Sequence, residues 1–296
     1  STLLASSAAS DVYKRQAARR LIIDYIKGET PEYVNMPDCD DTLELRAALR
    51  DIGLGLSGHC YNLGSGGTSM RFFTALAASV EGFDGVVDCS PQLRRRPLSP
   101  LVDALRAIGA DIEYLEEDGC APIYIRGKKL KGGEVTVDAG LSSQFISALM
   151  LVSRLWESPL SLRLRGGIVS RPYVEMTKRL LEMSGEDSVP YIEGDWSAAA
   201  FFYAYCLLAP ERDVCVGLLR KPDLSVQGDA AVVDIFKYLG VESEWKRDGE
   251  VVLKGNRQTI DRRRGMSEPV ELDMGDIPDL VPALVVCMAC LLYTSD

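Results

Sequence analysis

The sequence contains a single histidine, His59. A serine or cysteine nucleophile that relies on a histidine base would have to use it, and nothing nearby marks it as a base. We therefore interpret His59 as a structural or bystander residue. Catalysis by a Ser-His-Asp or Cys-His group is not expected.

Paired metal ligands are also lacking. The eight cysteines are dispersed, and the only close pair, Cys287 and Cys290, lies in an apolar run. Zinc would need two more ligands, and no second C-x-x-C or histidine pair follows. We expect these two cysteines to pack in a core. Dispersed cysteines are typical of a reducing compartment, so we expect a cytoplasmic protein.

Long apolar runs and positive charge are scarce. No run reaches the roughly 18 apolar residues that suggest a membrane span, so no membrane partner is expected. The net charge is −10, which disfavours general nucleic-acid binding. An anionic ligand would need a locally basic site, and residues 94–96, Arg-Arg-Arg, are one candidate. Three consecutive arginines fit a solvated loop equally well.

The two ends of the chain carry peptides that look foreign. "DVYKRQ" (11–16) and "CLLYTS" (290–295) can be encoded by reverse-complementary DNA. They resemble a translated sequencing adapter. We therefore expect residues 1–16 and 290–296 to be non-native, and we exclude both from fold reasoning.

One unit of sequence occurs twice. Residues 101–127 and 232–255 each begin with apolar residues at helical spacing, followed by Gly109 or Gly240 as a helix C-cap. Each continues as two strands around an Asp-Gly turn. A repeated helix-plus-hairpin unit predicts a pseudo-symmetric α/β architecture.

A third copy is incomplete. Residues 173–185 supply the helix and its glycine, but the hairpin is missing, and the chain leads to an apolar helix from about Ser197. Either a hairpin has been lost or the sequence is damaged here.

Small and polar residues gather where strands are predicted to give way to helices. In residues 64–67 the sequence Gly-Ser-Gly-Gly precedes Thr68 and Arg71. A glycine turn opening a helix exposes N–H groups at the positive end of the helix dipole, which suits an anion. A plain tight turn is equally compatible. Arg96, just before Pro97, can clamp a carboxylate or phosphate.

Two further junctions carry hydroxyl groups. A strand is predicted to end at Asp138, and Ser142, Ser143 and Gln144 then open a helix. The pattern favours Ser142 as an N-cap, with donation to a phosphate as the alternative. Ser170 and Tyr173 precede and open the next helix in the same way.

An acidic cluster surrounds Pro278. Asp276 is a candidate helix cap and Asp279 a first-turn acid that favours the helix dipole. Asp279 is equally a candidate base that would take a proton from a hydroxyl group.

Taken together, these junctions resemble the EPSP synthase (3-phosphoshikimate 1-carboxyvinyltransferase) family. The matching stretches occur in that family's order: "LGSGGTSMR", "RRPLSPLVDALRAIGA", "DAGLSSQFISALM", "VSRPYVEMT", "EGDWSAAAFF" and "DIPDL". The resemblance covers nearly all of residues 17–289 and about two thirds of a full member.

The resemblance implies the two-lobed α/β fold called the inverse α/β prism, with lobes of three βαβαββ units and an active site in the cleft between them. We expect the first lobe at 17–193 and an incomplete second lobe at 194–289. The implied reaction moves the enolpyruvyl group of phosphoenolpyruvate to the 5-hydroxyl of shikimate 3-phosphate. No metal or organic cofactor and no partner beyond these two small molecules is implied, and we expect a monomer.

The resemblance also assigns residues by position. Gly67 and Arg96 match residues that hold phosphoenolpyruvate, with Thr68 beside them, and Gln144 matches one between the two ligands. The shikimate phosphate falls to Ser142, Ser143 and Ser170. Arg71 and Tyr173 line the cleft. Asp279 matches the aspartate that holds the reacting hydroxyl and is the proposed base.

The chain departs from the family pattern in several places. Ser65 stands where asparagine is usual. The N-terminal Lys-Ser-x-x-Asn-Arg motif is absent as such; Arg19 is the candidate for its arginine, and Lys14 falls at the lysine offset but inside the adapter-like peptide. The Lys-Glu-x-x-Arg motif, the His-Arg pair and the last lysine are missing. We therefore expect the chain to be poorly stable and inactive or nearly so.

Two other functions compete with this one. The UDP-N-acetylglucosamine enolpyruvyl transferase shares the fold but generally uses a loop cysteine as its acid, and no cysteine lies at that place before Pro97. The other rival is a non-catalytic anion-binding protein.

Overall fold

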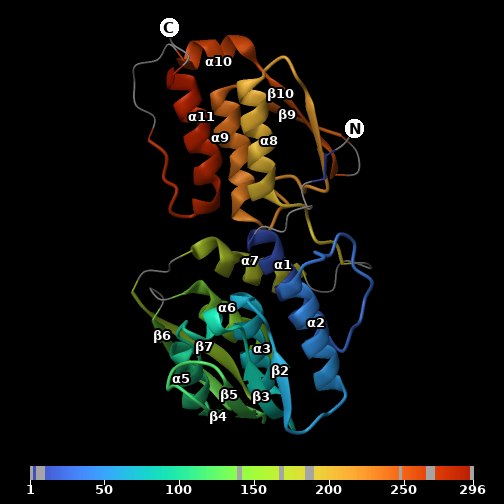
Figure 1. Cartoon of the computed structure of the whole chain (residues 1–296), viewed down its shortest axis with the longest axis vertical. Coiled ribbons are helices and arrows are strands. Elements are labelled where there is room, and N and C mark those ends of the chain that lie inside the picture. The colour runs from blue at the N-terminus through green and yellow to red at the C-terminus, as the bar shows by residue number, and fades with distance from the viewer. Residues whose placement is uncertain are drawn as a thin grey trace. The chain divides into compact units, whose positions relative to one another are not determined.

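The computed structural model describes residues 3–4, 11–138, 142–166, 170–183, 190–246, 249–264 and 271–293 of the chain. The chain folds into two compact units. The first unit comprises Lys14–Pro190, and the second comprises Ser1–Tyr13 with Tyr191–Asp296. The positions of the two units relative to one another are not determined, so each is described by itself (Figure 1).

The helices and strands of the first unit follow in chain order. Its elements are α1 (Asp11–Lys27, whose first residues belong to the second unit), α2 (Asp40–Gly53), β2 (His59–Asn62), α3 (Gly67–Ser79), β3 (Asp84–Asp88), α4 (Pro91–Arg94), α5 (Ser99–Ala107), β4 (Asp111–Tyr114), β5 (Ile123–Arg126), β6 (Gly132–Asp138), α6 (Ser143–Val152), β7 (Ser158–Arg165) and α7 (Arg171–Met183). A short 3₁₀ turn, Ser153–Leu155, precedes β7. Residues 11–16, predicted to be foreign, are thus part of a helix.

A four-stranded sheet in the order β2-β3-β5-β4 anchors the first unit. The strands β2 and β3 are parallel, and β5 and β4 form an antiparallel hairpin beside β3. Its parallel pair ends at Asn62 and Asp88, which lie opposite each other in the register. The loops that follow these two residues carry the glycine turn and the three arginines, so the sheet sets both of them at one edge.

The helix α3 is the centre of the first unit. All its residues from Ser69 to Ser79 are buried, because α2, α5 and α6 pack around it. Phe72 and Phe73 are completely buried, and burial of such side chains stabilises the fold by about 1.5–3 kcal/mol each. The glycine turn at its start is therefore attached to a rigid element.

The second unit repeats the same arrangement. Its elements are β1 (Leu3–Leu4), α8 (Trp196–Leu208), β8 (Val214–Gly217), the 3₁₀ turn Gly228–Ala231, α9 (Val232–Leu239), β9 (Val241–Trp245), β10 (Val251–Gly255), α10 (Arg257–Arg264), the 3₁₀ turn Pro278–Leu280 and α11 (Val281–Tyr293). Its sheet has the order β1-β8-β10-β9, with a parallel pair and an antiparallel hairpin. In Figure 1, α8, α9 and α11 lie side by side next to this hairpin.

The predicted repeat is confirmed in its strands and helix ends. Gly109 and Gly240 follow α5 and α9 with φ of +105° and +109°, the left-handed region that favours glycine. The turn predicted at Asp118–Gly119 is present, since the N–H of Cys120 donates to the carbonyl of Glu117, but it lies inside a longer loop, residues 115–122, between β4 and β5. The corresponding turn in the second hairpin falls partly on residues 247–248, outside the described residues.

The third copy has a helix but no hairpin in the described residues. The strands β6 and β7 form a two-stranded parallel sheet, and α7 follows β7. Residues 184–189, after α7, lie outside the described part of the chain. The next described helix, α8, begins at Trp196, close to the predicted Ser197.

None of the helices in the described segments has the length and apolarity needed to cross a membrane.

Candidate functional site

The first junction is a glycine turn that opens α3, as predicted. The first residue of α3 is Gly67, its N-cap is Gly66, and no side chain caps the helix. The helical ladder starts with the N–H of Met70 on the carbonyl of Gly66, so the N–H groups of Gly67, Thr68 and Ser69 precede it. Such groups favour an anion at the helix N-terminus.

Two guanidinium groups lie beside Gly67. A Cβ atom at this position would come within 2.9 Å of Nη1 of Arg71 and 3.8 Å of Nη1 of Arg96. Glycine at this position therefore leaves room for both arginine side chains. The structure brings Gly67, Thr68, Arg71 and Arg96 together, although Arg96 comes from a different loop.

Arg71 is an interior cation with unused donor capacity. Its side chain is only 6% exposed, and Nη1 donates to the carbonyl of Gly67 at 2.8 Å. Its Nε has no hydrogen-bond partner in the described part of the structure. Burial, followed by the charge of Arg96, lowers the pKa of Arg71 to about 10, so it stays protonated at neutral pH.

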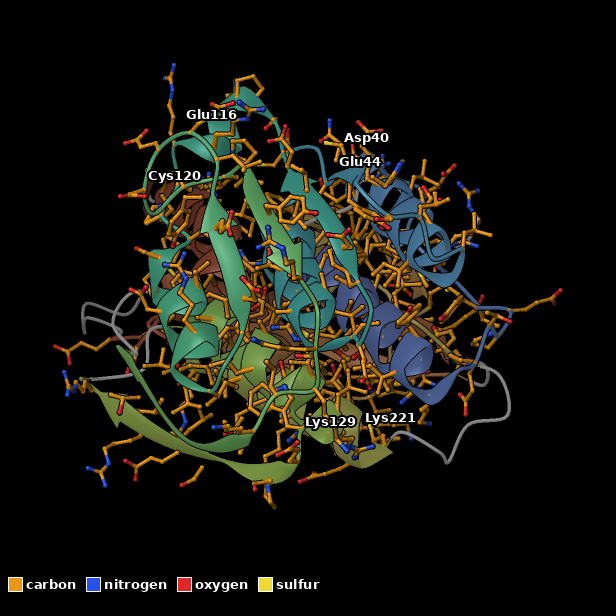
Figure 2. All side chains as sticks on the ribbon, turned by 90° about the horizontal axis from the view of Figure 1, so that it is seen from below. Asp40, Glu44, Glu116, Cys120, Lys129 and Lys221 are labelled. Atoms are coloured by element: carbon orange, nitrogen blue, oxygen red, sulfur yellow. The ribbon has the colours of Figure 1, made fainter. Side chains whose placement is uncertain are left out.

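The other end of the turn is acidic. Gly64 has φ of +52°, and a Cβ atom there would collide with the carboxylate of Glu44. Burial, then Asp41 and Asp40, raise the pKa of Glu44. Figure 2 shows Asp40 and Glu44 at the start of α2. An anion is therefore favoured at the Gly67 end of the turn and disfavoured at the Gly64 end.

Ser142 acts as a helix cap. Its Oγ accepts the N–H of Gln144 at 3.2 Å, as predicted for an N-cap. Ser143 is buried, whereas Gln144 is partly exposed. Phe145, on the same turn of α6, lies 5.2 Å from the guanidinium carbon of Arg71, which connects this junction to the first one.

The junction before α7 has an unusual backbone. Ser170 has φ of +57°, a backbone conformation that residues other than glycine rarely adopt. Its carbonyl accepts the N–H of Tyr173. The ring of Tyr173 is nearly buried, and the guanidinium of Arg15 lies over it at 4.1 Å. Residues 167–169, just before Ser170, lie outside the described residues.

Arg19 is held entirely inside the first unit. Its side chain is 0% exposed, and it donates to Thr177 Oγ1, Ser147 Oγ and the carbonyls of Tyr173 and Arg15. Burial, followed by the charge of Arg15, lowers its pKa to about 9. These contacts join α1, α6 and α7 and favour a role in positioning the helices, whereas direct ligand contact stays an untested prediction.

Lys14 and Arg15 lie in the peptide predicted to be foreign and were therefore not predicted as site residues. The structure places Lys14 beside Asp41 and Arg15 beside Tyr173. Lys14 Nζ lies 3.2 Å from Asp41, and the charge of Arg15 lowers the pKa of both Arg19 and Arg71. The signal that could have found Arg15 is its position four residues before Arg19, on the same face of a helix.

Asp279 lies in the second unit. It is exposed, in the first turn of the Pro278–Leu280 3₁₀ helix that leads into α11, as predicted. The prediction that Asp276 caps this helix is wrong, because the N-cap residue is Ile277. The position of Asp279 relative to the residues of the first unit is not determined.

Within the described segments, no group of three or more His, Cys, Asp or Glu side chains could hold a metal ion.

The protein-family model for EPSP synthase (3-phosphoshikimate 1-carboxyvinyltransferase) matches residues 56–187 and 183–296 of the chain. The chain belongs to the EPSP synthase family. The two matched pieces overlap at residues 183–187, the point where the third hairpin was expected. The EPSP synthase family therefore accounts for both halves of the chain.

Several individual EPSP synthases are similar to the chain. A 3-phosphoshikimate 1-carboxyvinyltransferase of Bacteroides fragilis is 35% identical, with 92% of this chain and 67% of the relative covered. A Shewanella baltica enzyme of the same name is 29% identical, covering 92% and 70%. The solved EPSP synthase of Acinetobacter baumannii has a TM-score of 0.70 at 21% identity, covering 93% and 69%.

These matches confirm the predicted enzyme family, its two-substrate transferase class and the enolpyruvyl transferase fold. The rival predictions of a UDP-N-acetylglucosamine enolpyruvyl transferase and of a non-catalytic anion-binding protein are not favoured. The chain spans about two thirds of the length of the relatives that it matches.

Proposed function

We propose that the chain binds shikimate 3-phosphate and phosphoenolpyruvate and carries the chemistry of the EPSP synthase reaction. The observation that carries this proposal is the convergence of Arg71 and Arg96 on Gly67 at the start of α3. Both substrates are anions, and two cations beside helix N–H groups that precede the helical hydrogen-bond ladder form a site that prefers them. This convergence also explains how an acidic chain can take an acidic ligand.

The roles of the individual residues follow from their surroundings. Gly67, Thr68 and Arg96 are proposed to hold the phosphate and carboxylate of phosphoenolpyruvate. Arg71 is proposed to position the Gly67 turn through its hydrogen bond to the Gly67 carbonyl. At the start of α6, we propose that Gln144 lies between the two ligands and contacts both. We propose that shikimate 3-phosphate contacts the Tyr173 ring and the hydroxyls of Ser142, Ser143 and Ser170.

The chemistry transfers one group and releases another. The 5-hydroxyl oxygen of shikimate 3-phosphate attacks C2 of phosphoenolpyruvate while C3 gains a proton, and the hydroxyl proton passes to Asp279 as the proposed base. The tetrahedral intermediate then loses phosphate from C2 and a proton from C3, which restores the double bond. Neither an oxidant nor a reductant is needed.

Gly67 provides the sharpest test of the site. The variant Gly67→Ala places a methyl group against Arg71 and should weaken phosphoenolpyruvate binding about tenfold or more, measured by titration calorimetry with shikimate 3-phosphate present. Gly53→Ala is the matched control, since a Cβ atom there would have no neighbour within 4 Å. Equal affinities for the two variants, or no binding of either substrate to the unmodified chain, would overturn the proposal.

Turnover is a separate question from binding. In the described residues, α6 and α7 follow the strands of a two-stranded sheet, whereas α3 follows a strand of a four-stranded sheet. We propose that phosphate release, measured in a coupled assay with both substrates, runs far below the rate of the Bacteroides fragilis relative. A comparable rate would show that this part of the proposal is wrong.

We also propose that the chain works as a monomer in the cytoplasm, without nucleic-acid or membrane partners. Its net charge of −10 supports the absence of nucleic-acid binding.

A further inference from the structure

The three consecutive arginines at 94–96 differ in their surroundings. Arg94 is bound to two carboxylates, whereas Arg95 is exposed and no described residue pairs with its guanidinium. Arg96 points its guanidinium to the Gly67 turn. We infer that Asp88, Arg94 and Glu116 form a clamp that positions Arg96 for anion binding, an inference that rests on the proposed function.

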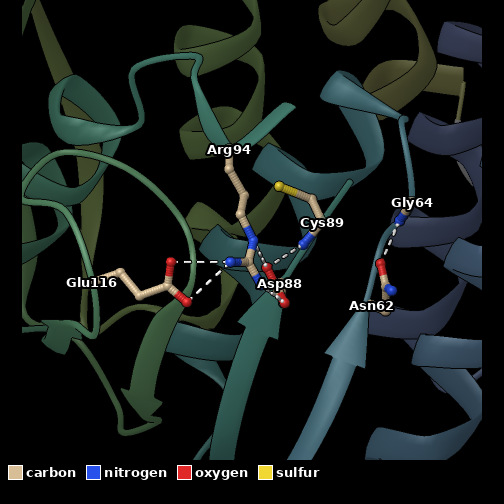
Figure 3. A network of polar contacts seen from close by, with 6 residues as sticks. All are labelled: Asn62, Gly64, Asp88, Cys89, Arg94 and Glu116. Carbon is tan, nitrogen blue, oxygen red and sulfur yellow. Dashed lines mark hydrogen bonds and ion pairs between the residues drawn. The ribbon is translucent and has the colours of Figure 1, made fainter. Parts of the chain in front are cut away.

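The clamp is a chain of charge-assisted hydrogen bonds (Figure 3). Arg94 Nε and Nη2 donate to the two oxygens of Asp88 at 2.8 and 2.5 Å, and Nη1 donates to both oxygens of Glu116 at 3.0 Å. Such two-pronged pairing fixes the plane of a guanidinium as well as its distance. Lysine could not make the same set of bonds.

Asp88 connects the clamp to the sheet and to the glycine turn. It is the last residue of β3, its carboxylate also accepts the N–H of Cys89 at 2.7 Å, and its carbonyl accepts the N–H of Leu63. The neighbouring Ser90 donates its N–H to the carbonyl of Gly64 at 2.7 Å. One end of the clamp is therefore fixed to the element that carries the turn.

Glu116 connects the clamp to the opposite side of the arginine segment. It lies with Cys120 on the loop between β4 and β5 (Figure 2). In the same loop, the carbonyl of Gly119 accepts hydrogen bonds from the N–H groups of Leu98 and Ser99. The stretch that contains Arg95 and Arg96 is thus held at both of its ends.

Arg96 follows the clamp by two residues. Its N–H donates to the carbonyl of Leu93 at 2.9 Å, which continues the short helix α4 that Ser90 caps. A side chain attached to so short and constrained a segment loses less freedom when it grips a ligand. Release of Arg94 would let the segment move and would withdraw Arg96 from Gly67.

The clamp also divides the charge of the three arginines. Arg94 is neutralised by Asp88 and Glu116, and hydrogen bonding to Asp88 raises its pKa further. Arg71 and Arg96 remain as the cations at the turn. The Glu116 arm is exposed and contributes little to stability, while the Asp88 arm is partly buried, and we assign the clamp to the placement of Arg96.

The decisive comparison is Arg94→Gln against Arg95→Gln, since both remove one positive charge beside Arg96 and only the first breaks the clamp. In hydrogen exchange of the ligand-free chain, Arg94→Gln should speed exchange of the amides of Leu93 and Arg96 about tenfold, and Arg95→Gln should leave them unchanged. The melting temperature of Arg94→Gln should fall by no more than about 3 °C.

Binding provides the second readout. Arg94→Gln should weaken phosphoenolpyruvate binding about tenfold, with Arg95→Gln within about twofold of the unmodified chain and Arg94→Lys between them. Should Arg94→Gln fail to fold, Glu116→Gln breaks only one arm and should give a smaller change in the same direction.

Equal exchange in the two variants would overturn the clamp. If the unmodified chain does not bind phosphoenolpyruvate, the proposed function fails, while the exchange comparison still decides whether Arg94 holds the segment.

Discussion

The helices α3 and α8 pack beside sheets with the same pattern of strand pairing. Of the two, only α3 has its side chains from Ser69 to Ser79 fully buried by neighbouring elements. Both are strongly apolar. In α3 every residue from Ser69 to Ser79 is buried, whereas α8 exposes Phe201, Tyr205 and Leu208, the first of them by 54%. These three residues recur at helical spacing, so they form one stripe.

The difference arises from the neighbours of each helix. α2, α5 and α6 pack around α3, while α9 and α11 are the helices that pack most extensively on α8. The same kind of sequence is therefore core in one unit and surface in the other. The unit that covers its central helix is also the one that carries the glycine turn, which suits a site that must hold two arginines in place.

The largest expected effect breaks this comparison directly. Phe72→Ala in α3 should lower the free energy of unfolding by about 3–5 kcal/mol, because Phe72 is completely buried. Phe201→Ala in α8 should change it by less than about 0.5 kcal/mol. Urea unfolding followed by circular dichroism measures both, and similar losses would show that α8 is covered as α3 is.

Glu193 should give the second largest effect, through pH. Its carboxyl is fully buried in the second unit, near Arg220 and Tyr191, and burial raises its pKa from 4.5 to about 7. Stability is therefore unaffected below pH 4.5, falls as the pH rises to 7, and then stays lower by on the order of 3 kcal/mol.

Glu193→Gln should remove this slope and make the chain more stable than the unmodified one at pH 8. The exposed Glu211→Gln is the control and should leave the profile unchanged. Tryptophan fluorescence reports on this unit through Trp196 and Trp245, which lie in edge contact. If the stability of Glu193→Gln still fell between pH 4.5 and 7 as steeply as that of the unmodified chain, Glu193 would not be the cause of the pH dependence.

The helix caps of the two units offer a smaller contrast. Ser142→Ala removes the bond to the Gln144 N–H and should destabilise the first unit by about 1 kcal/mol. Asp195 caps α8 by accepting the N–H of Ala198, and Asp195→Ala should destabilise the second unit by about 1.5–3 kcal/mol, since its carboxylate is buried. Chemical denaturation at pH 7 gives both values, and the reverse order would contradict the assignment.

The smallest effect on stability is expected at the exposed stripe of α8. The double variant Phe201→Ser/Leu208→Ser should reduce fluorescence of a bound apolar dye such as ANS and leave the free energy of unfolding within about 0.5 kcal/mol. Unchanged dye binding would mean that the stripe is not the apolar surface available in solution.

Local features of the site could be predicted from the sequence. The start of α3 at the glycine turn, the end of β6 at Asp138 and the Ser142 cap depend on residues close in the chain. The turn at Asp118–Gly119 was predicted correctly, but the longer loop around it was not, because an Asp-Gly pair does not reveal loop length. Asp276 was wrong as a cap because the 3₁₀ turn starts one residue later, with Pro278 at its first position.

Features that depend on distant residues could not be predicted. The pairing of Arg94 with Glu116 requires the β4–β5 loop to return beside α4. The burial of Glu193 depends on the segment at Ser225 to Gln227, far along the chain. Single-sequence patterns contain no information on such approaches, so the clamp and the buried carboxyl appear only in the folded chain.

Amide chemical-shift mapping by ¹⁵N NMR tests the anion site most directly. Phosphoenolpyruvate, added with shikimate 3-phosphate to the full chain, should shift the N–H signals of Gly67 and Thr68 most strongly, and Arg96→Gln should abolish these shifts. Shifts centred on another part of the chain, or shifts at Gly67 that persist without Arg96, would contradict the account.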